Sequence, residues 1–257
     1  MSERPANPTI AQIREISQPV SVTGRSNAEH WVADLYLRKL SPYLTRVLLR
    51  TPITANGVTY LMILSGISIS AALLIPGTTG LLLALFLSQL QMLWDCCDGE
   101  IARWRNTQSP KGVFLDRVGH YLTESLIPIA FALRISQWPD KEISDWRPLF
   151  LAALVSIAIL WNKGFNDIVH VSRAFSGLPK ISDSRESGSA VKSWLRIAKA
   201  PFKILAVQRL FHSVEMTIVI CIVGNRSRLI DVALYIALFV TIGHLVAILG
   251  SRKLDSR

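Results

Sequence analysis

Long uncharged blocks of apolar residues constrain the fold of this chain more than any other feature of its sequence. The first block, VTYLMILSGISISAALLI at 58–75, runs for 18 residues without a charge. A helix needs roughly 20 predominantly apolar residues to cross the hydrocarbon core of a bilayer. Half of the 257 residues are hydrophobic and only 18% are charged, fewer than a soluble domain usually carries. The sequence therefore predicts an integral membrane protein built from helices.

Six apolar segments are predicted to be transmembrane helices. The second and fifth have short apolar stretches, and the third is polar but is included because its neighbours need it for topology. We expect an all-α membrane protein with six transmembrane helices and an N-terminal interfacial helix. The six segments lie at about 58–75, 79–98, 112–133, 147–163, 210–224 and 230–249.

The rest of the chain divides around these segments. Residues 1–26 are polar and rich in proline and serine, which predicts a mobile tail. Aromatic, leucine and basic residues alternate after it, as in helices at a membrane surface, with a break at Pro42 and a helix cap at Asn56. The predicted parts are a polar tail (1–26), a membrane-surface segment (27–57), a six-helix transmembrane domain (58–250) and a basic C-terminal tail (251–257).

Basic residues predict which loops face the cytoplasm. Of the 28 lysines and arginines, 22 lie in the termini and in the loops after the second and fourth segments, and five lie in the other loops. Such asymmetry places both termini and the loop after the second segment in the cytoplasm. The basic stretch 191–211 is interpreted either as an interfacial helix attracted to anionic lipids or as a plain basic loop. We expect a bacterial plasma membrane and no nucleic-acid partner.

A cluster of ionisable residues interrupts the apolar pattern near the end of the second segment. Asp95 and Asp98 are three residues apart and share a helix face, and Asp116 and His120 are four apart on the third segment. A short loop over 104–111 would fold the two segments into a hairpin. The polar faces of both helices are therefore predicted to converge at one depth.

Carboxylates gathered at low dielectric constant need a counter-charge to remain ionised. Mg²⁺ and Mn²⁺ take carboxylate oxygens as ligands and often bind substrate phosphates as well. Small residues nearby leave room for a ligand beside the backbone, and Arg103 and Lys111 can meet an anionic phosphate. The pattern favours a metal-assisted phosphate site at the membrane surface over a set of buried ion pairs.

The same stretch resembles the signature of the CDP-alcohol phosphatidyltransferase family, D-x2-D-G-x2-A-R-x8-G-x3-D-x3-D. The segment TAN-VT at 54–59 also resembles the family's sequence before its first span, with Ala55 where proline is usual. The signature covers about a tenth of the chain, and the six-span architecture extends the similarity. The matching positions are Asp95, Asp98, Gly99, Ala102, Arg103, Gly112 and Asp116.

The resemblance implies transfer of a phosphatidyl-type (substituted phosphate) group in phospholipid biosynthesis. An alcohol hydroxyl attacks the β-phosphate of a CDP-linked donor, commonly CDP-diacylglycerol, and CMP leaves. It further implies two divalent cations, Mg²⁺ or Mn²⁺, a catalytic domain over 58–250, and a homodimer. The small alcohol acceptor stays open between glycerol phosphate, inositol or its phosphate, serine and choline-like compounds. The implied metal ligands are Asp95, Asp98, Asp116 and His120, and the implied CDP contacts are Asp95, Gly99, Ala102, Arg103 and Gly112.

His120 departs from the signature, which has an aspartate there that the family uses as general base. One hypothesis is that the neutral imidazole accepts the hydroxyl proton, since histidine titrates near cytoplasmic pH. A second is that His120 is structural and the transfer chemistry is lost. A third is that Glu124, one turn further on, serves as the base. The first is favoured because the three aspartates and all the small residues of the signature are kept.

Two other classes of function compete with the enzyme. A catalytically silent protein could bind CDP-lipid or act as a scaffold for other membrane enzymes. A transporter could use the ionisable residues of the second and third segments for ion coupling, although the sequence has no repeated half to support that hypothesis.

Other polar residues of the predicted spans have structural interpretations. Arg117 and Glu124 lie on nearly the same helix face and are predicted to form a salt bridge. Glu215 and His244 are predicted to make helix–helix contacts. Three residues of the loop after the fourth span could receive a phosphorylated or polyol acceptor or form a basic interfacial face: His170, Arg173 and Lys180.

Overall fold

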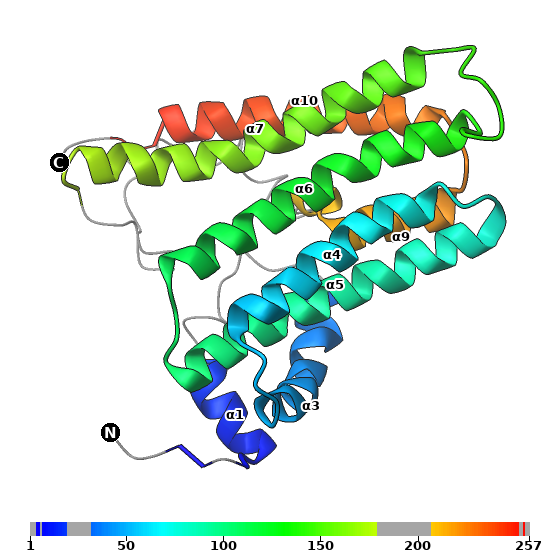
Figure 1. Ribbon diagram of the computed structural model, residues 1–257. Coiled ribbons are helices and arrows are strands. Elements are labelled where there is room, and N and C mark those ends of the chain that lie inside the picture. The colour runs from blue at the N-terminus through cyan, green and yellow to red at the C-terminus, as the bar shows by residue number, and fades with distance from the viewer. Residues whose placement is uncertain (1–3, 6, 20–31, 179–206, 252–253, 255–257) are drawn as a thin grey trace.

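The computed structural model describes residues 4–5, 7–19, 32–178, 207–251 and 254, and the elements of this part of the chain are helices (Figure 1). Helices occupy all six ranges predicted from the sequence, which confirms the all-helical class. Two of them run further than predicted, α5 to Arg105 and α7 to Phe175. The six are α4 (Ala55–Leu73), α5 (Gly77–Arg105), α6 (Pro110–Ile135), α7 (Arg147–Phe175), α9 (Ser213–Val223) and α10 (Arg228–Leu249).

Four of these helices, α4, α5, α7 and α10, are long and apolar enough to cross a membrane. Helix α6 is not among them, and it carries five charged residues, Lys111, Asp116, Arg117, Glu124 and Arg134. Helix α9 has 11 residues, which at about 1.5 Å per residue is roughly half of the ~30 Å hydrocarbon core. The four apolar helices support an integral membrane protein, whereas the count of six spans is not confirmed.

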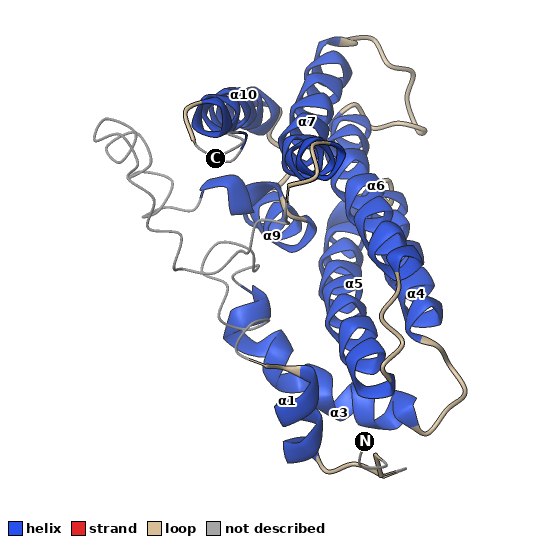
Figure 2. Cartoon of the chain, turned by 90° about the vertical axis from the view of Figure 1, so that its left-hand side faces the viewer, coloured by secondary structure: helices blue, strands red, loops and turns tan. Residues whose placement is uncertain are grey.

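Helix α6 lies at the centre of the bundle. It packs against α4 on one side and α7 on the other, while α10 lies along α7 and α9 packs on α5 (Figures 1 and 2). Gly66 allows the close approach of α4 and α6, because a Cβ atom there would overlap the hydroxyl of Thr123. This contact holds α6 alongside α4 and so brings its polar face to the end of α5.

Part of the N-terminal segment is folded, in contrast to the predicted mobile tail. Helix α1 (Ile10–Ser17) begins with a capping box, in which the side chains of Thr9 and Gln12 each accept the other residue's backbone N–H. Ser17 is fully buried, and its Oγ donates to the carbonyl of Glu100 in α5 at 3.1 Å. The polar composition was misleading because this helix docks through hydrogen bonds.

Pro42 does not break the surface segment, contrary to the prediction. A π-helical turn, η1 (Ala33–Leu37), leads directly into α3 (Arg38–Leu49), which continues through the proline. Proline leaves the carbonyl four residues before it without a helical partner. Here the Arg38 carbonyl accepts from Nε2 of Gln18 at 2.7 Å instead. The segment after α1 therefore supplies the missing bond, and the interfacial position of α3 stays a prediction.

Capping residues mark the start of α4 and the two ends of the loop between α5 and α6. Thr54, and not Asn56 as predicted, caps α4 by accepting the backbone N–H of Gly57 at 3.0 Å. Asn106 adopts a left-handed conformation, with φ of 54°, and ends α5. Ser109 caps α6, so the loop is only 106–109 and the predicted hairpin forms through a shorter turn.

Several predictions fall wholly or partly outside the described residues. Lys180, most of the basic stretch 191–211 and most of the C-terminal tail 251–257 belong to this group. Within the basic stretch, the described part is a short 3₁₀ turn, η2 (Val207–Phe211). Attraction to anionic lipids and the cytoplasmic placement of both termini therefore stay predictions.

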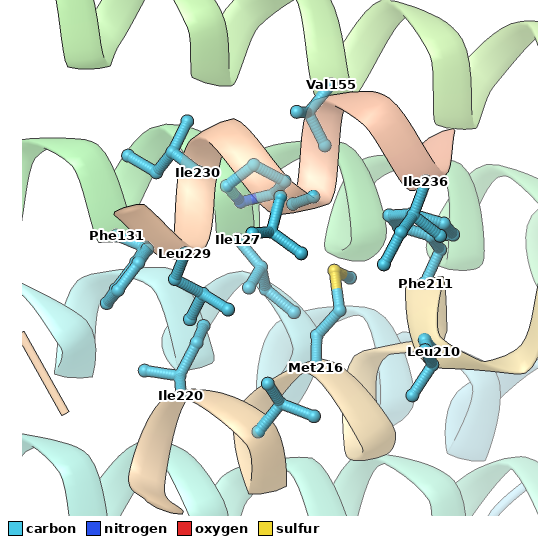
Figure 3. A pocket seen from close by; sticks show the side chains of 14 residues that line it. Ile127, Phe131, Val155, Leu210, Phe211, Met216, Ile220, Leu229, Ile230 and Ile236 are labelled. Carbon is cyan, nitrogen blue, oxygen red and sulfur yellow. The ribbon is translucent and has the colours of Figure 1, made fainter. Parts of the chain in front are cut away.

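An apolar pocket lies between α6, α7, η2, α9 and α10 (Figure 3). The side chains that line it are all apolar and include Ile127, Met216 and Ile230. Because the described residues that line this pocket include no ionisable side chain, they offer no group for the chemistry predicted from the sequence.

Candidate metal and phosphate site

Asp95 of α5 meets Asp116 and His120 of α6 beside the hairpin. His120 Nε2 lies 3.0 Å from Asp95 Oδ1 and 3.6 Å from Asp116 Oδ1. One ligand atom from each of the three residues lies within 4.8 Å of the others. Their side chains are partly exposed, at 22% for Asp95, 41% for Asp116 and 15% for His120. We call these three residues the acidic cluster, and a ligand can reach it from outside the helix bundle.

Asp98 lies one turn beyond Asp95 and is not a member of this group of three. Its Oδ2 accepts a hydrogen bond from Thr59 Oγ1 of α4 at 2.6 Å. Asn56 also faces this region, since a Cβ atom added to Gly112 would lie 3.1 Å from its Oδ1. Helix α4 thus contributes polar side chains to the site, and the sequence signals them only through the family-like stretch that contains both residues.

Three residues predicted to contact CDP follow on α5. The guanidinium of Arg103 lies over Gly99, where an added Cβ atom would be 2.9 Å from Nη1. Arg103 Nε donates to the carbonyl of Ser17 in α1 at 2.5 Å. Gly99, Ala102 and Arg103 are all partly exposed. Nothing in the sequence pattern indicates that α1 holds this arginine.

Glu124 lies one turn beyond His120 on α6 and is fully buried. Its Oε1 is 3.5 Å from His120 Nδ1 and 3.3 Å from Nδ1 of His212, the residue before α9. Its Oε2 is 2.8 Å from Lys163 Nζ of α7. A buried carboxylate needs such partners, because burial alone penalises its charge. The side chain joins the acidic cluster to two further elements of the bundle.

The predicted salt bridge between Arg117 and Glu124 is wrong. Arg117 pairs with Asp167 of α7, which also accepts a hydrogen bond from the hydroxyl of Tyr121 at 2.6 Å. Seven residues of helix span about 10.5 Å along the axis, so partners on the adjacent helix are nearer. Sequence spacing on one helix cannot reveal these neighbours.

A second buried carboxylate, Glu100, lies on α5 five residues after Asp95. Its Oε1 accepts from Ser41 Oγ at 2.5 Å and from Gln18 Nε2 at 2.8 Å. Its Oε2 accepts from Thr45 Oγ1 at 2.6 Å. These three hydrogen bonds join Glu100 to α3 and to the residue after α1, and so tie the N-terminal helices to α5.

Among the remaining polar residues, the predicted helix contact of His244 is confirmed. His244 Nδ1 of α10 lies 2.6 Å from Asn162 Oδ1 of α7, a helix–helix contact. Glu215 is buried on α9, in keeping with a contact role. His170 and Arg173 lie in the last turns of α7, and their part in receiving an acceptor stays a prediction.

The fold and the site define a class of protein, a helical membrane protein with a cluster of possible metal ligands on a hairpin of two helices. Residues 52–175 match the family model of CDP-alcohol phosphatidyltransferases. This match over 124 of the 257 residues confirms the resemblance predicted from the signature. The matched segment contains the acidic cluster, Glu124 and Lys163. No curated protein matches the chain at a significant level.

Proposed function

We propose that this protein transfers a phosphatidyl-type group from a CDP-linked donor such as CDP-diacylglycerol to a small alcohol, with release of CMP. The family match supports the general reaction. The observation that carries the proposal is the convergence of Asp95, Asp116 and His120 within the matched segment. We further propose that the site faces the cytoplasm and that the protein acts as a homodimer.

The donor set fits a divalent cation. Two carboxylates and an imidazole approach one another closely enough to share an ion, and such oxygen-rich sets suit Mg²⁺ or Mn²⁺. Asp95 and Asp116 would hold the ion, with Asp98 joining from the next turn of α5. The Nε2 lone pair of His120 cannot bind the ion and accept a proton at once, and we assign it to the proton of the alcohol. Two such ions, when bound, would supply polarisation of the phosphoryl group and stabilisation of the charge on the leaving CMP.

The other residues of the site bind and orient the reactants. Small residues at positions 102 and 112 would let the CDP moiety approach the backbone, and Arg103, whose guanidinium lies over Gly99, would offer that guanidinium to its phosphates. His120 takes the proton of the alcohol as the new bond from oxygen to phosphorus forms. The bond between the same phosphorus and the CMP oxygen breaks, and CMP leaves. The proton is then on His120, and the lipid phosphate is joined to the alcohol oxygen.

Release of CMP tests the proposal. Purified protein would be incubated with CDP-diacylglycerol, Mg²⁺ or Mn²⁺, and a panel of alcohols that includes glycerol phosphate, inositol, inositol phosphate and serine. One alcohol is expected to support turnover, and a chelator should abolish it. Asp116→Ala is the matched control and should release no CMP. If no acceptor supports turnover while the donor still binds, the transferase assignment is overturned.

His120 favours one alternative, a silent protein that binds CDP-lipid or acts as a scaffold for other enzymes. The signature has aspartate at this position, so the substitution could mark lost chemistry. The two functions differ in the behaviour of His120→Asp. A silent protein that lost only its base should gain CMP release from this substitution, whereas an enzyme that uses the imidazole should not need it.

A further inference from the structure

We propose that Glu124 is a positioning residue that fixes the ring of His120, with Nδ1 held toward Glu124 and Nε2 directed at Asp95 and Asp116. The consequence for turnover rests on the proposed function. The orientation of the ring does not, and it can be measured separately.

Both nitrogens of the His120 ring face carboxylates. Nδ1 is 3.5 Å from Glu124 Oε1, and Nε2 is 3.0 Å from Asp95 Oδ1. The two ring nitrogens are chemically distinct, and the partner of one decides whether the other is available to accept a proton or bind a cation. Histidines at metal sites commonly direct their second nitrogen at a carboxylate for this reason. The geometry gives Glu124 that position.

Glu124 is itself held in place from three elements. Lys163 Nζ lies 2.8 Å from Oε2, and His212 Nδ1 lies 3.3 Å from Oε1. The carboxylate is fully buried, so its charge depends on these basic neighbours. A side chain fixed by α6, α7 and the start of α9 cannot rotate freely, and this rigidity is what orientation of a partner requires.

The same surroundings exclude Glu124 as the base. Its side chain is buried, and both oxygens point at basic groups. A base must reach the hydroxyl it deprotonates, directly or through one water. Glu124 contacts the acidic cluster through the His120 ring. The hypothesis that Glu124 is itself the base is therefore not favoured.

Asp167 supplies a matched control. It is also a carboxylate that links α6 to α7, through Arg117 and Tyr121, but its partners are other than His120. Asp167→Asn removes a charge from the same helix interface and leaves the Glu124 contacts in place. A merely structural role for Glu124 predicts that both substitutions act alike.

Nitrogen NMR of histidine-labelled protein in micelles with Mg²⁺ measures the ring directly. The His120 resonances are assigned by their loss in His120→Ala. We expect a proton on Nδ1, and we expect Glu124→Gln to shift the Nδ1 resonance while Asp167→Asn leaves it in place. A ring that carries its proton on Nε2 alone, or an Nδ1 resonance that Glu124→Gln does not move, overturns the proposal.

Kinetics then test the consequence for turnover. Loss of a residue that orients a metal-site histidine typically costs about 10–100-fold. Glu124→Gln should lower kcat by this factor and leave KM for the CDP donor within about threefold, since Glu124 does not reach the donor. Asp167→Asn should change neither constant by more than about threefold. A loss confined to KM, or an equal loss in both variants, contradicts the proposal.

The two failures can be told apart. If wild-type protein releases no CMP, the proposed function fails, but the spectrum still decides the orientation of His120. If CMP is released and the spectrum contradicts the orientation, only the positioning role fails. Should Glu124→Gln not fold, the wild-type spectrum and Glu124→Asp, which retracts the carboxylate by one methylene, decide the question. A protonated Nδ1 that Glu124→Asp shifts supports the proposal, and one that it leaves unchanged overturns it.

Discussion

Helix α5 carries two groups of polar contacts within five residues, around Asp95 and around Glu100, and they are built in opposite ways. Glu100 is fully buried and accepts hydrogen bonds from Ser41, Thr45 and Gln18, all neutral. Asp95 is partly exposed and shares a histidine with a second carboxylate, Asp116. Both oxygens of Glu100 accept hydrogen bonds from side chains of the N-terminal helices and the residue after α1. Asp95 and Asp116 both approach Nε2 of one imidazole, that of His120.

This difference separates a carboxylate that supports the fold from two carboxylates that we propose bind a cation. A buried charge with several donors is stabilised, whereas two carboxylates near each other repel and favour a cation between them. Burial alone would have ranked Glu100 as the more unusual residue. Asp95 and Asp116 are the better candidates for binding a cation, because a ligand can reach them and because their partners include a second carboxylate.

The largest expected effect follows from removing a carboxylate of the acidic cluster. Asp116→Asn should lower CMP release about 1000-fold, since a lost metal ligand forfeits several kcal/mol of charge stabilisation. Asp116 is partly exposed, so thermal unfolding in micelles should change little. A variant that unfolds readily instead would place Asp116 in the same structural class as Glu100.

His120→Ala is expected to have the next largest effect. Loss of a general base costs about 100- to 10,000-fold in rate, and CMP release at saturating substrate measures it. An unchanged rate would show that the imidazole is not the base. Comparison with His120→Asp, which restores the residue of the signature, separates loss of the base from loss of the ring.

Glu100→Ala should act on stability and not on chemistry. It would leave buried donors on Ser41, Thr45 and Gln18 without their acceptor, at a cost of about 3 kcal/mol. We expect a lower unfolding temperature, with CMP release per folded molecule within about threefold of wild type. A rate loss as large as that of Asp116→Asn would remove the distinction between the two carboxylate groups.

The smallest effect is expected at the surface of the α6–α7 interface. Asp167→Asn weakens the pair with Arg117, which is 45% exposed, and exposed ion pairs contribute about 1 kcal/mol or less. The amide oxygen can still accept from Tyr121. Unfolding in micelles should therefore shift only slightly, and a large shift would show that this pair anchors the helices as firmly as Glu100 does.

The acidic cluster could be predicted from the sequence because its spacing is local. Offsets of three and four residues put Asp95 with Asp98, and Asp116 with His120, on common helix faces. A short loop then requires the two helices to be antiparallel neighbours. The same logic failed for Arg117, whose partner belongs to another helix.

The helical membrane class, the α5–α6 hairpin and the cluster of possible metal ligands follow from local sequence, because apolar run length and helical periodicity are properties of the local chain. The docking of α1 on α5 and the contacts of Glu124 with His120, Lys163 and His212 depend on how the helices pack. Those contacts join residues 39 to 88 positions apart, or depend on the rotation of α6 within the bundle. The periodicity of one helix does not encode which neighbouring helix will pack against it. The surroundings of His120 and Glu124 therefore depend on the packing of the bundle.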